Sequence, residues 1–292
     1  MSGDQRWLVA AAPPVFVVLW ASGFIGVKLG MPHVEPFTFL MLRMLAAVAL
    51  IAVVILVTRP PRPDLAAVGH NVVAGLLMHG GYLGGTFIAI SHGLAAGLTS
   101  LVVGLQPILL ATVANAVIGE KVGARQWLGL VLGFTGLVLV VQDRTVGGSA
   151  EPVAWICATV ALLSITSGTL YQKKFAGSGI DWRPAFLVQY GATAVMAGVC
   201  AMLFETMEVD WTGEFVVALA WLVLVLSFGA IWLLYFLIRR AAATKISSLF
   251  FLSPPTTAVM AWAMFGEKLG LLPVIGMAIS VTGVFLVNRR GS

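Results

Sequence analysis

Charged side chains are scarce in this sequence. Asp, Glu, Lys and Arg together make up 10% of the 292 residues, whereas about a quarter is usual in soluble globular domains. Hydrophobic residues make up 60%. This balance excludes an ordinary soluble domain and predicts an all-α integral membrane protein whose solvent is the lipid bilayer. The net charge of +5 does not indicate nucleic-acid binding, because Lys and Arg lie singly or in pairs at the ends of apolar runs.

Signatures of catalysis and of cofactors are also missing. The two cysteines, Cys157 and Cys200, lie in different apolar segments without CxxC spacing, which predicts neither a metal site nor a disulfide. The sequence has no Walker A motif, HExxH pair or nucleophile elbow. We therefore expect no catalytic residues, no cofactor and no enzymatic activity.

Apolar runs bounded by charges, prolines and turns predict ten transmembrane helices. Their approximate ranges are 9–29, 36–58, 69–90, 95–118, 124–141, 152–172, 184–205, 214–237, 243–265 and 271–287. Helices of this length use almost the whole chain, so no room remains for a soluble domain.

Basic residues are unevenly distributed between the two sides that these spans define. With the N-terminus in the cytoplasm, thirteen of the seventeen Lys and Arg fall in inner segments, and the outer segments hold only Lys28, Arg144 and Lys268. The connection 205–214, assigned outside, carries four acidic residues and no base. The positive-inside rule therefore predicts that both termini are cytoplasmic.

The second half of the sequence repeats the first. A shift of 147 residues aligns 95–136 with 242–283 without a gap, and a shift of 145 residues aligns Ser22-Gly23 with Ser167-Gly168. Each copy has a proline and a Gly-Glu-Lys turn at the same spacing: Pro107 and 119–121, then Pro254 and 266–268. Composition alone does not produce that coincidence.

Five spans is an odd number, so the second copy must enter the membrane from the opposite side. We therefore predict two inverted five-helix repeats, residues 1–146 and 147–292, around a central cavity. Inverted repeats are typical of secondary transporters, which expose a midplane site alternately to each side of the membrane.

Particular residues carry a resemblance to a known family. The Trp20-Ala-Ser-Gly-Phe24 stretch, the paired Gly-Glu-Lys turns and two Gly-rich final helices resemble the EamA-type drug/metabolite transporters over nearly the whole chain. Within that superfamily the likeness is greatest to exporters of aromatic amino acids in bacterial inner membranes. The resemblance implies a ten-helix basket with a central cavity and export of amino acids or related metabolites. We expect a monomer that acts on such small molecules.

Polar residues at mid-depth are candidates for the substrate site, because polar groups are costly in hydrocarbon and usually face a cavity or a helix interface. His79, Tyr82 and Thr86 fall at i, i+3 and i+7, within one stripe of a helix. We expect this stripe to line the cavity. The alternative is that His79 only bonds a carbonyl of a neighbouring helix.

The span 152–172 repeats this spacing with Ser164, Ser167 and Tyr171, and Trp20 lies near the same depth by the repeat alignment. We expect these residues to line the cavity as well. Each serine could instead bond to its own helix, and Trp20 could pack against lipid.

Prolines interrupt two apolar runs at equivalent mid-membrane positions. Gln106 precedes Pro107, and Ser253 precedes Pro254 and Pro255. Proline removes an amide donor and frees carbonyls that a polar substrate could use. We predict paired kinks or hinges that border the cavity, with Gln106 and Ser253 in its wall. The alternative is that the kinks serve packing alone.

Ionisable groups are nearly absent at mid-depth. Every Asp and Glu lies at a span end or in a loop, although a buried carboxylate is the usual group for proton coupling. The sequence therefore favours a facilitator of zwitterionic solutes, in which His79 supplies hydrogen bonding rather than protons. We expect Arg43 to snorkel or to bond a carbonyl; the alternative is that it attracts a substrate carboxylate.

Other functions stay open. A translocator of lipid or phosphorylated metabolites would need a basic cluster at the cavity, and only Arg43 is close. A proton-coupled drug exporter would need a mid-depth carboxylate. An intramembrane lipid-modifying enzyme with His79 as base would need a carboxylate or metal partner at the same depth.

Overall fold

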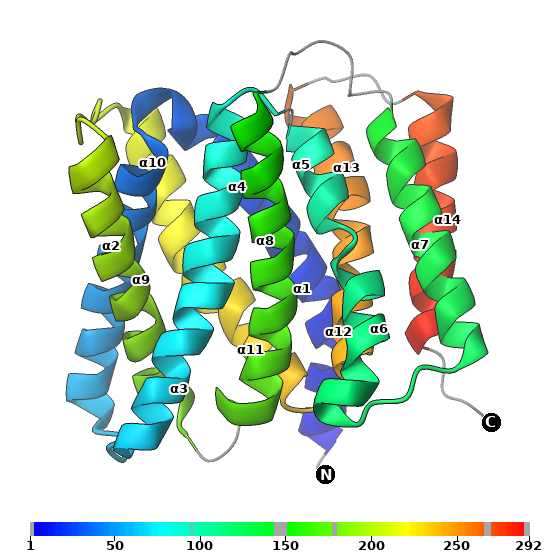
Figure 1. Cartoon of the computed structure of the whole chain (residues 1–292), viewed down its shortest axis with the longest axis horizontal. Coiled ribbons are helices and arrows are strands. Elements are labelled where there is room, and N and C mark those ends of the chain that lie inside the picture. Colours follow the sequence, from blue (N-terminus) through cyan, green and yellow to red (C-terminus); the bar gives the residue numbers. More distant parts are fainter. Residues whose placement is uncertain (1–2, 95, 143–150, 177–179, 266–269, 289–292) are drawn as a thin grey trace.

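The computed structural model describes residues 3–94, 96–142, 151–176, 180–265 and 270–288, and these residues are mostly helical (Figure 1). The first half contains α1 (Gly3–Gly30), η1 (Met31–His33), α2 (Pro36–Thr58), α3 (Leu65–Gly75), η2 (Leu76–Gly81), α4 (Tyr82–Ser91), α5 (Ala96–Val103), α6 (Gln106–Ile118) and α7 (Ala124–Gln142). The second half contains α8 (Pro152–Tyr171), η3 (Gln172–Ala176), α9 (Trp182–Phe204), α10 (Gly213–Trp221), η4 (Leu222–Ala230), α11 (Ile231–Ile238), α12 (Ala243–Ser248), η5 (Leu249–Leu252), α13 (Ser253–Phe265) and α14 (Leu271–Asn288). In Figure 1, α1 begins and α14 ends on the same side of the molecule.

Eight of the described helical stretches are long and apolar enough to cross a membrane. They are Ala11–His33, Pro36–Thr58, Leu65–Ser91, Leu101–Ile118, Pro152–Phe175, Trp182–Phe204, Gly213–Ile238 and Leu271–Asn288. The apolar stretch Ala124–Val140 is shorter, and α13 ends next to residues 266–269, which lie outside the described part of the chain. Helices are present in all ten predicted ranges. The protein is thus all-α with eight candidate spans, and ten crossings stay a prediction.

The outside of the helices carries large apolar side chains. Leu56 and Val57 of α2 are 73% and 77% exposed, and Met202 and Phe204 of α9 are 71% and 74% exposed. Such a surface would drive a soluble protein to associate, whereas lipid tails solvate it. The composition and the outer surface therefore indicate the same solvent.

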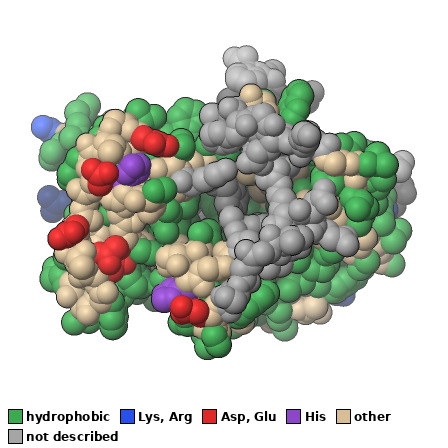
Figure 2. Space-filling model, turned by 90° about the horizontal axis from the view of Figure 1, so that it is seen from above, with side chains coloured by type: hydrophobic (Ala, Val, Ile, Leu, Met, Phe, Trp, Pro, Cys, Tyr) green, Lys and Arg blue, Asp and Glu red, His purple; other side chains and the backbone are tan. Residues whose placement is uncertain are grey.

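Acidic and histidine side chains gather on one face of the molecule (Figure 2). His33 Nδ1 lies 3.2 Å from the Asp210 carboxylate, and the Glu35 carboxylate accepts a hydrogen bond of 2.8 Å from the Thr206 amide. These bonds join the start of α2 to the 205–214 connection, which the charge distribution predicts to lie on the outer side.

Helices α7 and α14 pack against each other at glycines that the repeat makes equivalent. A Cβ atom added at Gly129 would lie 2.6 Å from the carbonyl oxygen of Gly283, and one added at Gly276 would lie 2.6 Å from that of Gly136. Gly129 and Gly276 are 147 residues apart, as are Gly136 and Gly283. The two contacts therefore mirror each other, and only glycine allows backbones to approach so closely.

Other contacts between the two halves also join helices that the repeat makes equivalent. The carboxylate of Glu205, after α9, accepts hydrogen bonds from the amides of Phe37 and Thr38 at the start of α2, at 2.6 and 2.7 Å. Helix α1 packs against α13 and α10, while its repeat counterpart α8 packs against α6 and α4. Each half thus contacts the other through equivalent helices.

The regular helical geometry is interrupted at equivalent places in the two halves. π-Helical segments occur in η2 and η4, in the third and eighth predicted spans. The fourth predicted span breaks between α5 and α6, directly before Gln106, and the ninth changes from the 3-10 turn η5 to α13 at Ser253. The π-helix corrects one assumption of the sequence analysis, because His79 does not lie on a continuous α-helix with Tyr82 and Thr86.

Candidate functional site

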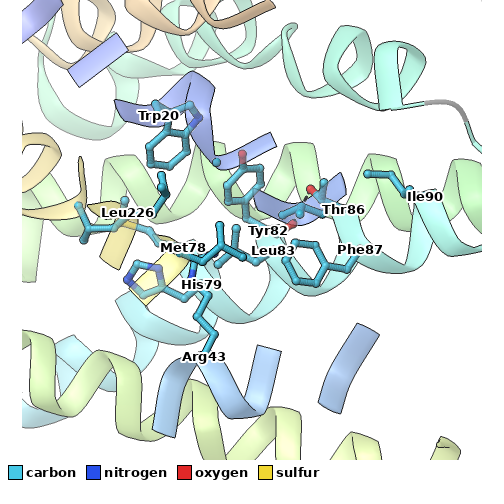
Figure 3. A pocket seen from close by; sticks show the side chains of 14 residues that line it. Trp20, Arg43, Met78, His79, Tyr82, Leu83, Thr86, Phe87, Ile90 and Leu226 are labelled. Atoms are coloured by element: carbon cyan, nitrogen blue, oxygen red, sulfur yellow. Dashed lines mark hydrogen bonds between the residues drawn. The ribbon is translucent and has the colours of Figure 1, made fainter. Parts of the chain in front are cut away.

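A cavity lies between α1, α2, η2, α4 and η4, and Figure 3 shows the side chains around it. Its volume is about 60 Å³, whereas pockets for drug-sized ligands hold roughly 300–1,000 Å³. Predicted site residues in its wall are Trp20, His79, Tyr82 and Thr86. A solute larger than a few water molecules therefore needs the surrounding helices to move apart.

Two aromatic rings form one wall of the cavity. The rings of Trp20 and Tyr82 are stacked, with centroids 6.2 Å apart and planes at 11°. Phe250 meets the Trp20 ring edge-on at 5.1 Å. Both stacked side chains are buried, at 8% and 5% exposure. Trp20 thus lies inside the protein, not against lipid, and its ring offers a flat apolar surface to a ligand.

A second, smaller cavity adjoins the first and shares Trp20, Tyr82 and Thr86 with it. Ser253 and Pro254 lie in its wall. The Ser253 hydroxyl is buried and has no hydrogen-bond partner among the described residues. The predicted proline site of the second half therefore borders the smaller cavity. The equivalent Pro107 is buried at the start of α6 and is not among the residues that line either cavity.

His79 is 2% exposed, and its ring centroid lies 5.1 Å from that of Tyr190. Its Nε2 atom is buried without a partner in the described part of the chain. A carbonyl bond to this atom, one alternative from the sequence, is therefore not seen. Burying a nitrogen without a hydrogen-bond partner costs free energy, and a bound ligand or water that bonds to it would remove that cost.

Arg43 is also in the cavity wall, and its side chain extends from α2 toward His79 (Figure 3). It is 5% exposed, and its Nε donates a hydrogen bond of 3.2 Å to the Ser227 hydroxyl of η4. The sequence predicts that Arg43 snorkels or bonds a carbonyl. Its burial contradicts snorkelling, and its hydrogen bond goes to a hydroxyl, not to a carbonyl. The partner Ser227 is 184 residues away in sequence, so no local signal identifies it.

Four predicted site residues lie elsewhere. Gln106 is buried and donates to the Thr169 hydroxyl at 3.3 Å, and Ser164 packs against Gly81. Ser167 is exposed on α8 and bonds to the carbonyl of Leu163, its alternative from the sequence. Tyr171 lies at the end of α8, where its hydroxyl is 2.8 Å from His70 Nδ1. The structure does not bring these four to either cavity.

A polar network on the other side of His79 escaped the sequence analysis. Gln189 of α9 donates to Asn71 of α3 at 2.8 Å and to Gln172 of η3 at 3.1 Å. All three side chains are buried. Amide residues inside apolar runs were the available signal, but which of them meet depends on helix packing.

Each half contains an aromatic pair, and Phe87 of the first pair is in the cavity wall. Phe39 of α2 lies 5.8 Å from Phe87 of α4, and Phe186 of α9 lies 5.5 Å from Tyr235 of α11, between ring centroids. Phe39 and Phe186 are 147 residues apart. Each half thus contains an aromatic pair built on an equivalent phenylalanine.

Three carboxyl groups outside the candidate spans have shifted pKa values. The hydrogen bond from the Thr206 side chain lowers the pKa of Glu35, and the one from Arg183 lowers the pKa of Asp181. Burial raises the pKa of Glu120, although Lys173 opposes the shift. The described residues contain no group of three or more His, Cys, Asp or Glu that could hold a metal ion.

Comparisons with known proteins agree on a family. The model of the EamA-like transporter family matches residues 10–142 and 153–289. The uncharacterized transporter YvbV of Bacillus subtilis is 28% identical, covering 94% of this chain and 89% of that protein. A "Probable amino-acid metabolite efflux pump" of Escherichia coli is 23% identical, covering 92% and 91%. A crystal structure with 17% identity has a TM-score of 0.79 and covers 95% of this chain and 96% of its own, which shows a shared fold.

Proposed function

This chain belongs to the EamA-like transporter family, and on that premise we propose that it exports amino acids, aromatic or otherwise neutral, and related metabolites across a bacterial inner membrane. The cavity is the substrate site in this proposal. The observation that carries it is a buried cavity with stacked rings and unpartnered polar groups, which suits a solute with an apolar body and a polar end. The printed name of the Escherichia coli relative supports the same substrate class.

We further propose ten spans in two inverted repeats, residues 1–146 and 147–292, with both termini cytoplasmic and a monomer as the working unit. The exchanged contacts of α7 with α14 and of α2 with α9 support the repeat, as do the two ranges that the family model matches. Alternating access then consists of opening the cavity to one side of the membrane while it stays closed to the other.

Transport is facilitative in this proposal. No carboxylate lines the cavity among the described residues, and the buried proton-binding group expected of a proton antiporter is not found there. The solute gradient is then the driving force for neutral amino acids, and His79 acts as a hydrogen-bonding group.

Efflux from proteoliposomes tests the substrate class. Vesicles containing the purified protein and loaded with phenylalanine, leucine or a related metabolite should equilibrate faster than protein-free vesicles. If a sugar phosphate equilibrates while no amino acid or derivative does, the proposal is wrong and a phosphorylated-metabolite translocator takes its place.

His79 tests the facilitative mechanism. The wild type and His79→Ala should be compared between pH 5.5 and 8, with and without a proton gradient. We expect the variant to be slower and neither protein to concentrate solute when a proton gradient is imposed. Concentrative flux that depends on the gradient and vanishes in His79→Ala would make His79 the coupling group.

A further inference from the structure

Arg43 is a buried guanidinium without a counter-ion among the described residues. It lies in the membrane-spanning helix α2, is 5% exposed, and makes one hydrogen bond in the described part of the chain, from Nε to the neutral hydroxyl of Ser227. No ion pair to a described carboxylate is formed. A charged group in this position is costly unless an anion accompanies it, so intramembrane charges usually mark a ligand path.

The other described residues of the cavity wall do not supply that anion. Its polar side chains are His79, Tyr82, Thr86 and Trp20, and none is acidic. The Thr86 hydroxyl is already bonded to the Tyr82 carbonyl at 2.7 Å. The wall therefore carries one positive charge from Arg43, together with apolar surface from side chains such as Leu226 and Phe87.

We propose that this cavity is a site for monocarboxylate anions, in which the Arg43 guanidinium binds the carboxylate and the Trp20–Tyr82 stack holds an aromatic or branched apolar group. The preferred solutes are amino-acid derivatives without a free ammonium group, such as 2-oxo acids, ahead of the zwitterionic amino acids themselves. This inference rests on the proposed function, because it takes the cavity as the transport site.

The charge balance separates these two solute classes. A carboxylate paired with a guanidinium can form two parallel charge-assisted hydrogen bonds. A zwitterion makes the same pair but brings an ammonium group into a wall without a carboxylate, where only ring faces and carbonyls receive it. Phosphate dianions fit less well, because they need more than one cationic partner.

The negative charge of the solute also gives export a direction. A solute of charge −1 leaves a cell whose interior is negative with the help of the membrane potential, roughly a 50-fold concentration ratio for each 100 mV. Net outward transport of such an anion needs no proton-binding carboxylate in the cavity. This matches a site whose described residues contain a permanent cation and no acid.

Paired solutes test the proposal. Proteoliposomes of the purified full chain are loaded with phenylalanine or with phenylpyruvate, which differ mainly in the ammonium group, and efflux is followed against protein-free vesicles at pH 7.5. We expect phenylpyruvate to leave at least about tenfold faster, because both solutes form the carboxylate–guanidinium pair but only phenylalanine also brings in an ammonium group that no carboxylate receives. A negative interior imposed with potassium and valinomycin should accelerate phenylpyruvate efflux and leave phenylalanine efflux unchanged.

Variants assign the preference to Arg43. Arg43→Gln should lose the phenylpyruvate advantage, and Arg43→Lys should keep the preference at a lower rate because it retains the charge without the planar fork. Arg62→Gln makes the same chemical change at an exposed loop position and should behave as wild type. If Arg43→Gln does not fold, Arg43→Lys and the wild-type pair of solutes still decide.

The outcomes distinguish the two proposals. Phenylalanine efflux equal to or faster than phenylpyruvate efflux, with no response to potential, overturns the anion site and leaves amino-acid export standing. A preference that survives unchanged in Arg43→Gln also overturns it. If neither solute nor any other amino acid crosses, the proposed function fails and this inference fails with it.

Discussion

At the crossing of α7 and α14, equivalent positions carry the same residue and make the same contact, whereas at the cavity they do not. Gly136 lies against the backbone of Gly276, and Gly283 lies in the same way against the backbone of Gly129. Arg43 of α2 has Tyr190 of α9 as its equivalent, again 147 residues on. Both reach Ser227, where Arg43 donates to the hydroxyl and Tyr190 donates to the carbonyl oxygen.

The difference separates two requirements of one transporter. Helices that must exchange positions between two conformations benefit from symmetric contacts, because each conformation is then the mirror of the other. A solute has no such symmetry, so the residues that bind it have to differ between the halves. We infer that repeat-equivalent positions with the same residue serve the conformational change, and that equivalent positions with different residues determine substrate specificity.

The largest expected effect concerns the symmetric region. Gly136→Ala and Gly283→Ala each place a Cβ atom against backbone of the facing helix. Each should lower the free energy of unfolding by about 1–3 kcal/mol, since the helices must separate to accept it. Thermal unfolding in detergent measures the loss, and the two losses should be equal within about 0.5 kcal/mol.

Gly191→Ala is the matched control, because no atom lies within 4 Å of a Cβ atom added there. It should not lower stability. If one of these two variants is as stable as wild type while the other unfolds, the α7–α14 contacts are not symmetric in energy, although the sequences of the two helices are alike. That result would contradict the symmetry of this region.

A smaller effect is expected in the asymmetric region. Trp20 has Ile165 as its equivalent in the 145-residue register, so the ring exists in one half only. Trp20→Ala should slow efflux of ring-bearing solutes about tenfold, because the stack with Tyr82 is lost, and should slow leucine efflux less. Trp20→Phe should retain most of the selectivity.

Ile165→Val is the control in the other half. Ile165 is buried, so the change should cost a little stability without altering the ratio of phenylalanine to leucine efflux. Equal shifts of that ratio in both variants would show that the ring of Trp20 does not set specificity.

The fold was accessible from the sequence because its signals are local or repeated. Apolar runs mark the helices, and the spacing of Pro107 and Pro254 marks equivalent breaks that the structure contains. Because mid-depth polarity is rare, the sequence could place Trp20, His79, Tyr82 and Thr86 at the first cavity and Ser253 at the adjoining one.

The rest depended on how distant helices meet. Arg43 looked like a snorkelling residue because Ser227 is far away in the chain, and nothing in the sequence brings them together. Ser164 and Ser167 have the same local context, yet α8 buries one and exposes the other. The π-helix that carries His79 has no composition signal of its own.

The smallest expected effect concerns the turns that join the spans. Glu120 accepts a hydrogen bond of 3.0 Å from the Ala243 amide, and its other oxygen is buried without a partner among the described residues. Burial raises its pKa in the folded protein above the ordinary value of 4.5. As the pH rises above 4.5, the unfolded chain releases this proton before the folded chain does, so stability falls through that window and stays lower above it.

Glu120→Gln keeps a neutral acceptor for Ala243 and removes the charge. It should be slightly more stable than wild type at pH 7.5, with the difference shrinking toward zero near pH 4.5, and thermal unfolding across this range measures it. Glu208→Gln, at an exposed position, is the control and should show no such trend. Glu267 is the repeat counterpart of Glu120 but lies outside the described residues. An equal pH trend in Glu267→Gln would extend the symmetry from the helices to the turns, whereas a trend in Glu120→Gln alone would place the turns with the cavity among the regions where the halves differ.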